Sequence, residues 1–334
     1  MALPLTRRGR VLAAVAGDPV DRPPVSFWGH FYDREQSAAD LADATLEARE
    51  RFDWDFVKLN PRASYHTEGW GVGFLYAGDP LVKPVRTAYP VHDAADYARI
   101  RPLPPDRGSL GEQLEAIRLV RAGLPADILL VETIFSPLAI LTDLTEGAEA
   151  VERHLVAAPD LVHRALEAVT DTFEAFARAA LAAGADGIYF ATVEWATHER
   201  WTPEAYRALA TPLDLRVLAA AQGAAFNVVH VCRPRNFLVG LADYPAHAFS
   251  WGATEAGNPN LRQGLEAIRG AAVGGIGYED ALVASDDSLA LAQLEEGFRL
   301  TGGRRWIVAP GCSILPQTHP ERLWALREAV LSRA

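Results

Sequence analysis

The run Phe226-Asn227-Val228-Val229-His230-Val231-Cys232 is apolar and rich in β-branched residues. Such a run predicts a buried strand. A helical pattern precedes it at 203–222, and a second strand-like run follows at 246–251. Strands separated by helices indicate parallel pairing through right-handed crossovers.

The same alternation continues outward over the whole chain. Candidate strands lie at 25–28, 55–60, 127–132, 186–191, 226–232, 246–251, 271–276 and 305–309. Helical patterns lie at 37–51, 111–122, 158–182, 203–222, 261–269, 288–301 and 320–332. Eight such strands in a chain of 334 residues predict an α/β fold, a closed (β/α)8 TIM barrel. An open doubly wound sheet is the alternative, but no Gly-x-Gly-x-x-Gly follows an early strand, so no dinucleotide site is predicted.

One stretch, 67–92, interrupts the alternation after the second strand. Its glycines and its Gly78-Asp79-Pro80 turn signal predict a hairpin excursion over one face of the barrel. No low-complexity linker divides the chain, so we expect one domain over residues 1–334.

The bulk composition excludes several classes of partner. A net charge of −11 argues against nucleic acid or an anionic membrane surface. No apolar run approaches the roughly 18 residues that a transmembrane helix needs. The N-terminal run 7–17 resembles a short signal peptide, but the Asp18-Pro19 turn after it fits a short amphipathic helix better. We therefore expect a cytoplasmic protein. Its excess of arginine over lysine is typical of a GC-rich bacterial genome.

The two cysteines of the chain stand in a pattern that suggests a metal site. His230 and Cys232 form a His-x-Cys pair, and Cys312 follows far along the sequence. In a cytosolic chain this spacing favours a metal over a disulfide. One imidazole and two thiolates suit Zn²⁺, and three protein ligands leave a fourth position open, as in catalytic zinc sites. The alternative is that both cysteines are small buried apolar residues.

Barrel chemistry lies at the C-terminal mouth, where the strands end. His230 and Cys232 are two residues apart and project from the same side of the fifth predicted strand, and Cys312 follows the eighth. We expect the following residues around this rim: Trp28, His30, Asn60, Glu132, Glu194, His230, Cys232, Trp251, Glu255 and Cys312.

Five short motifs along the chain form a combination typical of one family. They are 17–25 (Gly-Asp-Pro-Val-Asp-Arg-Pro-Pro-Val), 52–58 (Phe-Asp-Trp-Asp-Phe-Val-Lys), 184–188 (Gly-Ala-Asp-Gly-Ile), 274–276 (Gly-Gly-Ile) and 311–316 (Gly-Cys-Ser-Ile-Leu-Pro). On these residues the chain resembles the uroporphyrinogen decarboxylase superfamily over essentially its whole length. The resemblance implies a (β/α)8 barrel.

That superfamily has two branches with different chemistry. True decarboxylases use no metal, and they carry an Arg-Gln-Ala-Gly-Arg-Tyr motif after the first strand. The equivalent stretch here, 26–32, has no arginine, and the Phe-Ser-Asp motif of the decarboxylases is absent around 59–65. The second branch comprises zinc methyltransferases, whose His-x-Cys…Cys signature matches His230, Cys232 and Cys312. Many members have glycine after the first cysteine, where this chain has Arg233, and this departure bears on the substrate more than on the metal.

The second branch implies a set of cofactors and partners. A thiol bound at the open zinc position would lose its proton and attack the methyl group of a methylcobalt corrinoid (methylcobalamin). The corrinoid usually sits on a separate small protein, which would dock over the barrel mouth. The reverse transfer, into the corrinoid, stays open. Family members are often homodimers.

Further residues are candidates for the substrate or the metal. Glu255 is the first candidate for a fourth zinc ligand, because its place after His230 is near that of a ligating glutamate in cobalamin-independent methionine synthases. Glu194 is the second candidate. For both, a plain loop carboxylate is the alternative.

Candidates for substrate contacts come from several loops. Arg233 and Arg235 suit an anionic substrate tail, or are a surface pair in an acidic protein. Glu68 stands where relatives often have a glutamate beside the cavity, or is a carboxylate at the rim of the hairpin. Three tryptophans are candidates for aromatic walls of the pocket, and simple packing is the alternative: Trp28, Trp195 and Trp251. His30 is a candidate acid or base, or a rim histidine.

Three functions therefore compete. The first is a zinc-dependent methyltransferase that moves a methyl group between a corrinoid and a thiol. The second is decarboxylation of uroporphyrinogen or a related polycarboxylate. The third is a non-catalytic barrel that binds a corrinoid or a metal, since fold alone does not fix function.

Overall fold

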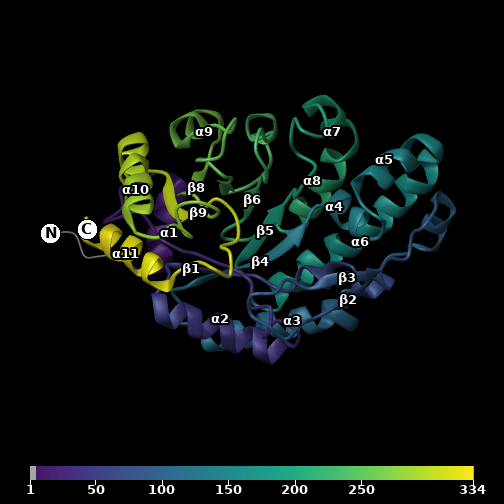
Figure 1. Ribbon diagram of the computed structural model, residues 1–334, viewed down its shortest axis with the longest axis horizontal. Coiled ribbons are helices and arrows are strands. Elements are labelled where there is room, and N and C mark those ends of the chain that lie inside the picture. The colour runs from purple at the N-terminus through teal and green to yellow at the C-terminus, as the bar shows by residue number, and fades with distance from the viewer. Residues whose placement is uncertain (1–4, 334) are drawn as a thin grey trace.

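A computed structural model describes residues 5–333 as an α/β barrel, with the parallel strands inside and the helices outside (Figure 1). The main sheet has seven parallel strands in the order β1-β4-β5-β6-β7-β8-β9. These strands are β1 (Phe56–Leu59), β4 (Leu129–Phe135), β5 (Gly187–Ala191), β6 (Val228–His230), β7 (Ala248–Ser250), β8 (Ala271–Ile276) and β9 (Trp306–Pro310). Each corresponds to a predicted strand, so the predicted fold class is confirmed.

The eighth position of the barrel is not a full strand. The predicted strand at 25–28 forms a single parallel bridge, Val25 to Val308, although it still closes the ring. Val308 N–H donates to Pro24 O at 2.8 Å, and Asp55 N–H donates to Val25 O at 3.0 Å. The preceding Pro23 and Pro24 have no N–H to donate, which limits the ladder to these few bonds. The prediction of a regular first strand was therefore wrong, whereas the prediction of a closed barrel holds.

The predicted excursion after the second barrel position is an antiparallel hairpin of β2 (Gly73–Leu75) and β3 (Val85–Ala88). Arg86 of β3 ties the hairpin to the chain at the end of α4 and just before α5, where it donates to Asp143 O at 2.9 Å and to Glu146 O at 2.8 Å (Figure 1).

The helices cover the outside of the sheet. They are α1 (Arg7–Ala16), α2 (Ala38–Phe52), α3 (Gly108–Gly123), α4 (Pro137–Asp143), α5 (Ala148–Ala157), α6 (Pro159–Ala182), α7 (Pro203–Leu209), α8 (Thr211–Ala220), α9 (Leu261–Ala267), α10 (Ser288–Thr301) and α11 (Pro320–Leu331). Short 3₁₀ turns are η1 (Ala63–His66), η2 (Glu68–Trp70), η3 (Ala94–Arg99) and η4 (Val239–Leu241). Side-chain caps begin several of the helices: Ser37 accepts a bond from Asp40 N–H at α2, and Asn260 forms a capping box with Gln263 at α9.

Two details of the helices differ from expectation. The pattern at 203–222 was predicted as one helix, but it is two, α7 and α8, since Pro212 in the first turn of α8 favours a new helix start. The short helices α4 and α5 were not predicted. None of the helices described between residues 5 and 333 has the length and apolar character needed to cross a bilayer.

The apolar core has two layers, which follow the alternation of the strands. Along β6, Val228 packs with residues of the barrel interior, and Val229 packs with the helices outside. His230 and Cys232 continue the inward-facing series, so the same alternation that builds the core also points both side chains into the barrel.

Candidate metal centre

The predicted metal ligands meet at the mouth of the barrel. His230 ends β6, Cys232 follows it by two residues, and Cys312 lies just past β9. The Sγ atoms of the two cysteines are 3.9 Å apart. One donor atom from each of the three residues lies within 4.8 Å of the others. The structure therefore brings together side chains that are far apart in sequence.

The buried side of His230 is oriented by its neighbours. Its Nδ1 lies 3.1 Å from Ser250 Oγ, which accepts a hydrogen bond from the Tyr189 hydroxyl at 3.0 Å. The Tyr189 ring also stacks on the imidazole, with 5.4 Å between the ring centres. His230 Nε2 is buried and has no hydrogen-bond partner among the described residues. A partner on one ring nitrogen and a free second nitrogen is the arrangement of a metal-binding histidine.

The donor set fits a tetrahedral zinc ion. Two sulfur ligands at the usual zinc–sulfur length of about 2.3 Å would lie about 3.8 Å apart in tetrahedral geometry. The observed separation of 3.9 Å is close to this value, and neither cysteine forms a disulfide. Their hydrogen bond lowers the pKa of the Cys312 thiol and raises the pKa of the Cys232 thiol.

A close contact between two backbones places Cys312. A Cβ atom on Gly311 would lie 2.9 Å from Gly252 Cα, which is closer than side-chain carbons approach. Gly311 N–H also donates to Ile276 O at 2.9 Å. Glycine at 311 therefore lets the end of β9 approach the end of β7, which brings Cys312 toward β6.

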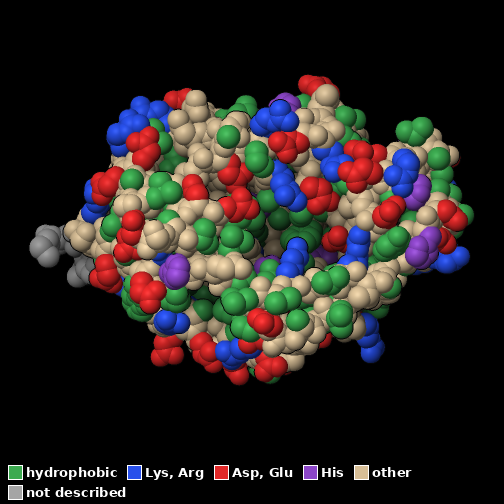
Figure 2. All heavy atoms as spheres, viewed as in Figure 1, with side chains coloured by type: hydrophobic (Ala, Val, Ile, Leu, Met, Phe, Trp, Pro, Cys, Tyr) green, Lys and Arg blue, Asp and Glu red, His purple; other side chains and the backbone are tan. Residues whose placement is uncertain are grey.

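All three candidate metal-binding side chains line one cavity of about 400 Å³. Figure 2 shows the hollow near the centre of the face, with acidic and basic side chains at its rim. Phe74, Lys83 and Pro84 of the hairpin form part of its wall. The volume lies within the range of about 300–1,000 Å³ that is typical of small-molecule sites.

Two carboxylates lie close to the candidate centre. Glu255 is half-buried and is coupled electrostatically to Cys312 and His230, and burial raises its pKa to about 7. Its carboxylate is not in the group of donor atoms within 4.8 Å, so the side chain would have to move to become a fourth ligand. Glu194 lines the cavity, where burial and the nearby Asp143 raise its pKa to about 7.

The candidates for substrate contacts separate into two groups. Arg233 lines the cavity, whereas Arg235 turns toward Glu199, with 3.5 Å between the charged groups. Glu68 is not among the residues that line the cavity; it is held by Arg62 at 2.7 Å, and it is Arg62 that faces the cavity.

The three tryptophans also differ. Trp28 belongs to the barrel interior beside Tyr189. Trp251 points outward, since it follows the inward-facing Ser250, and its Nε1–H donates to Pro259 O at 2.7 Å. Trp195 is fully buried and donates to Thr142 at 2.9 Å. The predicted rim residue Glu132 also lies behind the sheet, where Gln113 of α3 donates to both of its oxygens.

The sequence analysis missed an important cation. Lys58 of β1 is buried, lies 4.6 Å from the centre of the Tyr189 ring, and donates to Asn60. Burial lowers its pKa to about 7, so the ammonium group retains its proton best beside negative charge. The available signal was a lysine in the apolar strand Phe56–Leu59, on the inward-facing side.

Together, the fold and the donor set define a (β/α)8-barrel protein with a candidate soft-metal centre at its C-terminal mouth. The chain belongs to the uroporphyrinogen decarboxylase (URO-D) family, whose model matches residues 6–332. It is 25% identical over 339 residues to a methylcobamide:CoM methyltransferase, MtaA, of Methanosarcina barkeri, with 96% of each chain covered. It is 30% identical over 277 residues to a uroporphyrinogen decarboxylase of a Mycobacterium strain (KMS), with 76% of this chain and 73% of the relative covered.

Solved structures agree on the fold. A methyltransferase from Methanosarcina mazei superposes with a TM-score of 0.83 at 24% identity, over 97% of this chain and 99% of the other. A B12-independent methionine synthase from a Shewanella strain superposes with a TM-score of 0.59 at 11% identity, over 93% of this chain and 98% of the other.

Proposed function

We propose that the protein is a zinc-dependent methyltransferase that moves a methyl group between a corrinoid and a thiol. The observation that carries the proposal is the meeting of His230, Cys232 and Cys312 inside one cavity, with their donor atoms within 4.8 Å. The similarity to MtaA over nearly the whole chain supports the same reaction class.

Each part of the centre has a distinct task in this proposal. His230, Cys232 and Cys312 would hold the ion, and Ser250 would keep the imidazole in position. When bound, zinc would supply Lewis-acid activation that lowers the pKa of a thiol in the fourth position. The half-buried Glu255 would occupy that position when no thiol is present, and Glu194 and Arg233 would contact the substrate.

The corrinoid would come on a partner protein that docks over the mouth. The hairpin supports this placement, because it exposes four large apolar side chains near Lys83 and Pro84 of the cavity wall. They are Leu75 (65% exposed), Leu81 (55%), Val82 (44%) and Val85 (60%). Apolar side chains grouped on a surface are typical of an interaction site.

We further propose a cytoplasmic, single-domain protein.

Elemental mass spectrometry of protein purified without chelators or a histidine tag tests the metal. We expect about one zinc per chain in the wild type, and loss of the metal in Cys232→Ser/Cys312→Ser, since too few ligands remain. His230→Ala is expected to lose zinc, whereas the control His163→Ala, at an exposed position on α6, retains it. A wild type that binds no zinc on reconstitution contradicts the proposal.

Mass spectrometry of the thiol product tests the reaction. With methylcobalamin as donor, we expect thioether formation by the zinc-loaded wild type, and none by the double cysteine variant. Equal rates in the two proteins would rule out a role for the centre.

Decarboxylation is the second candidate, because relatives with 30% identity are uroporphyrinogen decarboxylases. The stretch 26–32 carries no arginine for a polycarboxylate, which weighs against it. Release of carbon dioxide from uroporphyrinogen by metal-free protein would favour this function over the first.

A further inference from the structure

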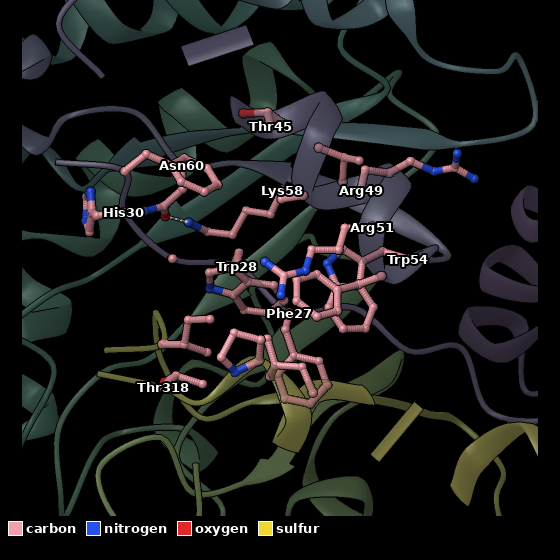
Figure 3. A pocket seen from close by; sticks show the side chains of 18 of the residues that line it. Phe27, Trp28, His30, Thr45, Arg49, Arg51, Trp54, Lys58, Asn60 and Thr318 are labelled. Carbon is pink, nitrogen blue, oxygen red and sulfur yellow. Dashed lines mark hydrogen bonds between the residues drawn. The ribbon is translucent and has the colours of Figure 1, made fainter. Parts of the chain in front are cut away.

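A second cavity, of about 190 Å³, adjoins the one lined by the three candidate metal ligands. It lies between the segment 27–31, helix α2 and the chain from Ile314 to Leu323 (Figure 3). His30, Lys58 and Asn60 line both cavities, so the two meet at these side chains. We refer to it as the side cavity.

The walls of the side cavity are largely apolar and aromatic. They include Phe27, Phe52 and Trp54 on one side and Leu315 and Leu323 on the other. Such walls favour an apolar body over a freely hydrated ion.

Several residues that line the side cavity carry buried hydrogen-bond donors without a partner. Of the eight buried polar atoms without a partner in the described chain, four belong to residues of the side cavity: Trp28 Nε1, Arg49 Nε, Asn60 Nδ2 and Thr318 Oγ1. All four can donate a hydrogen bond. Trp28 and Asn60 are each only 5% exposed. Buried polar groups normally have partners, so this concentration indicates a ligand that supplies acceptors.

The charge of the lining has one sign. Arg49, Arg51 and Lys58 line the side cavity, and among the described residues no aspartate or glutamate does, although the chain carries a net charge of −11. Arg49 is paired with Asp53 at 3.1 Å, whereas Arg51 makes no ion pair within residues 5–333. An acidic protein thus encloses a cavity free of carboxylates.

Two of these donors, on Trp28 and Asn60, lie with Lys58 at the inner end, where the cavities meet. Figure 3 shows the Lys58 ammonium meeting the Asn60 amide, with the Trp28 indole close by. Lys58 Nζ lies 5.7 Å from the centre of the Trp28 ring. Asn60 supplies its only acceptor among the described residues, so two of the three ammonium N–H groups remain available.

We propose that the side cavity binds a small organic carboxylate with an apolar body. The carboxylate group lies against Lys58, Asn60 and Trp28, where negative charge stabilises the buried ammonium. The apolar body lies against the aromatic walls toward Arg51. The cavity is smaller than the typical range of about 300–1,000 Å³, so it suits an acid of the size of benzoate. This site does not depend on the metal centre or on the proposed function.

Isothermal titration calorimetry with benzoate at pH 7 tests the site, with benzyl alcohol and benzylamine as neutral and cationic probes of similar shape. We expect the wild type to bind benzoate and to discriminate against both other probes by about tenfold or more, the usual effect of one charge-assisted hydrogen bond. Lys58→Met is expected to lose this preference while it retains the apolar volume.

The control uses the only other lysine of the chain. Lys83 is exposed and lines the cavity of the candidate metal ligands but not the side cavity, so Lys83→Met should bind benzoate as the wild type does. Ala48→Leu fills the side cavity without changing a charge and is expected to abolish binding of benzoate. A melting temperature for each variant confirms that it is folded.

Four outcomes contradict the proposal: no benzoate binding at millimolar concentration, equal binding of benzylamine, equal affinity in Lys58→Met, or equal affinity in Ala48→Leu. Cys232→Ser/Cys312→Ser separates this site from the metal centre. If the double cysteine variant still binds benzoate, the site is independent of zinc. If the double cysteine variant loses benzoate binding while Lys58→Met retains it, benzoate binds at the metal centre instead.

Discussion

At the scale of single residues, Ser250 decides which nitrogen of His230 can bind a metal. Its hydroxyl contacts Nδ1 at 3.1 Å, whereas Nε2 has no hydrogen-bond partner among the described residues and is free to bind a metal. Tyr189 donates to the same hydroxyl and stacks on the ring, so the imidazole is fixed from two sides.

Ser250→Ala is therefore expected to weaken zinc binding by about 10–100-fold, as loss of a partner behind a metal ligand usually does. Competition with a chelator of known affinity measures the effect. Ser313→Ala is the control, because it removes a hydroxyl that lines the same cavity without contacting His230. Unchanged zinc affinity in Ser250→Ala would show that the ring is held by other contacts.

The backbone conformation of Arg233 explains why glycine is favourable at the position after the first cysteine. Its φ of 75° lies in the left-handed region, which costs a residue with a side chain about 1–2 kcal/mol. The chain accepts this strain at a position where the guanidinium lines the cavity.

Arg233→Gly is expected to raise the free energy of unfolding by up to about 1 kcal/mol, since relief of strain exceeds the extra entropy of unfolded glycine. Arg233→Ala keeps the strain and removes the same guanidinium, which makes it the matched control. Urea unfolding measures both variants, and a glycine variant less stable than the alanine variant would contradict this account.

At the scale of elements, the ends of β7 and β9 approach each other through glycine. Gly311 and Gly252 leave no room for a Cβ between their backbones, and the contact aligns the loop that carries Cys312. The geometry of the candidate metal centre thus depends on how two strand ends pack as well as on its three candidate ligands.

We expect Gly311→Ala to displace this loop, to lower zinc affinity by about tenfold or more, and to reduce stability by about 1–3 kcal/mol, as overpacking does. Gly223→Ala is the control, because its added methyl group meets no atom within 4 Å. Zinc content and urea unfolding are measured together. If Gly311→Ala matches Gly223→Ala in both, the contact does not position the site.

The first two family motifs meet at the opposite end of the barrel. Arg22 of the first motif donates to both oxygens of Asp55 in the second, at 2.7 and 3.0 Å. Arg10 of α1 adds a bond of 2.7 Å to the same fully buried carboxylate. Asp55 also accepts from Val25 N–H at 2.8 Å. These motifs therefore stabilise the closure of the barrel, at the place where the first strand is only a bridge.

At the scale of the whole molecule, a buried carboxyl links stability to pH. Asp214 of α8 accepts hydrogen bonds from the hydroxyls of Tyr206 and Tyr244 at 2.8 and 2.9 Å. Burial raises its pKa from 3.8 to about 7. The folded state thus favours the protonated carboxyl. The contribution of this group to stability is complete below the unfolded pKa and falls as pH rises toward 7.

We expect the free energy of unfolding of the wild type to decline between about pH 4 and pH 7 more steeply than that of Asp214→Asn. Urea unfolding across this range measures the two slopes. Asp106→Asn, at an exposed carboxyl, should follow the wild type. Parallel curves for the wild type and Asp214→Asn would contradict the assignment of the titration to Asp214.

The sequence by itself determined the barrel and the three metal candidates. Strand alternation is a local property, so it predicted eight barrel strands, of which seven are regular strands in the structure, and the inward direction of His230 and Cys232. The missing backbone N–H groups of Pro23 and Pro24 are also a local property. Their effect, a first strand reduced to one bridge, appears only where Val25 meets Val308.

Only the tertiary structure decided which residues surround the candidate ligands. Glu68 and Trp251 have residue types that suit a substrate pocket, yet Arg62 holds the first outside the cavity and the strand alternation turns the second outward. Lys58 and Ser250 drew no attention in the sequence, because their roles depend on contacts across the barrel with Tyr189. Such contacts join residues distant in the chain, and no local pattern encodes them.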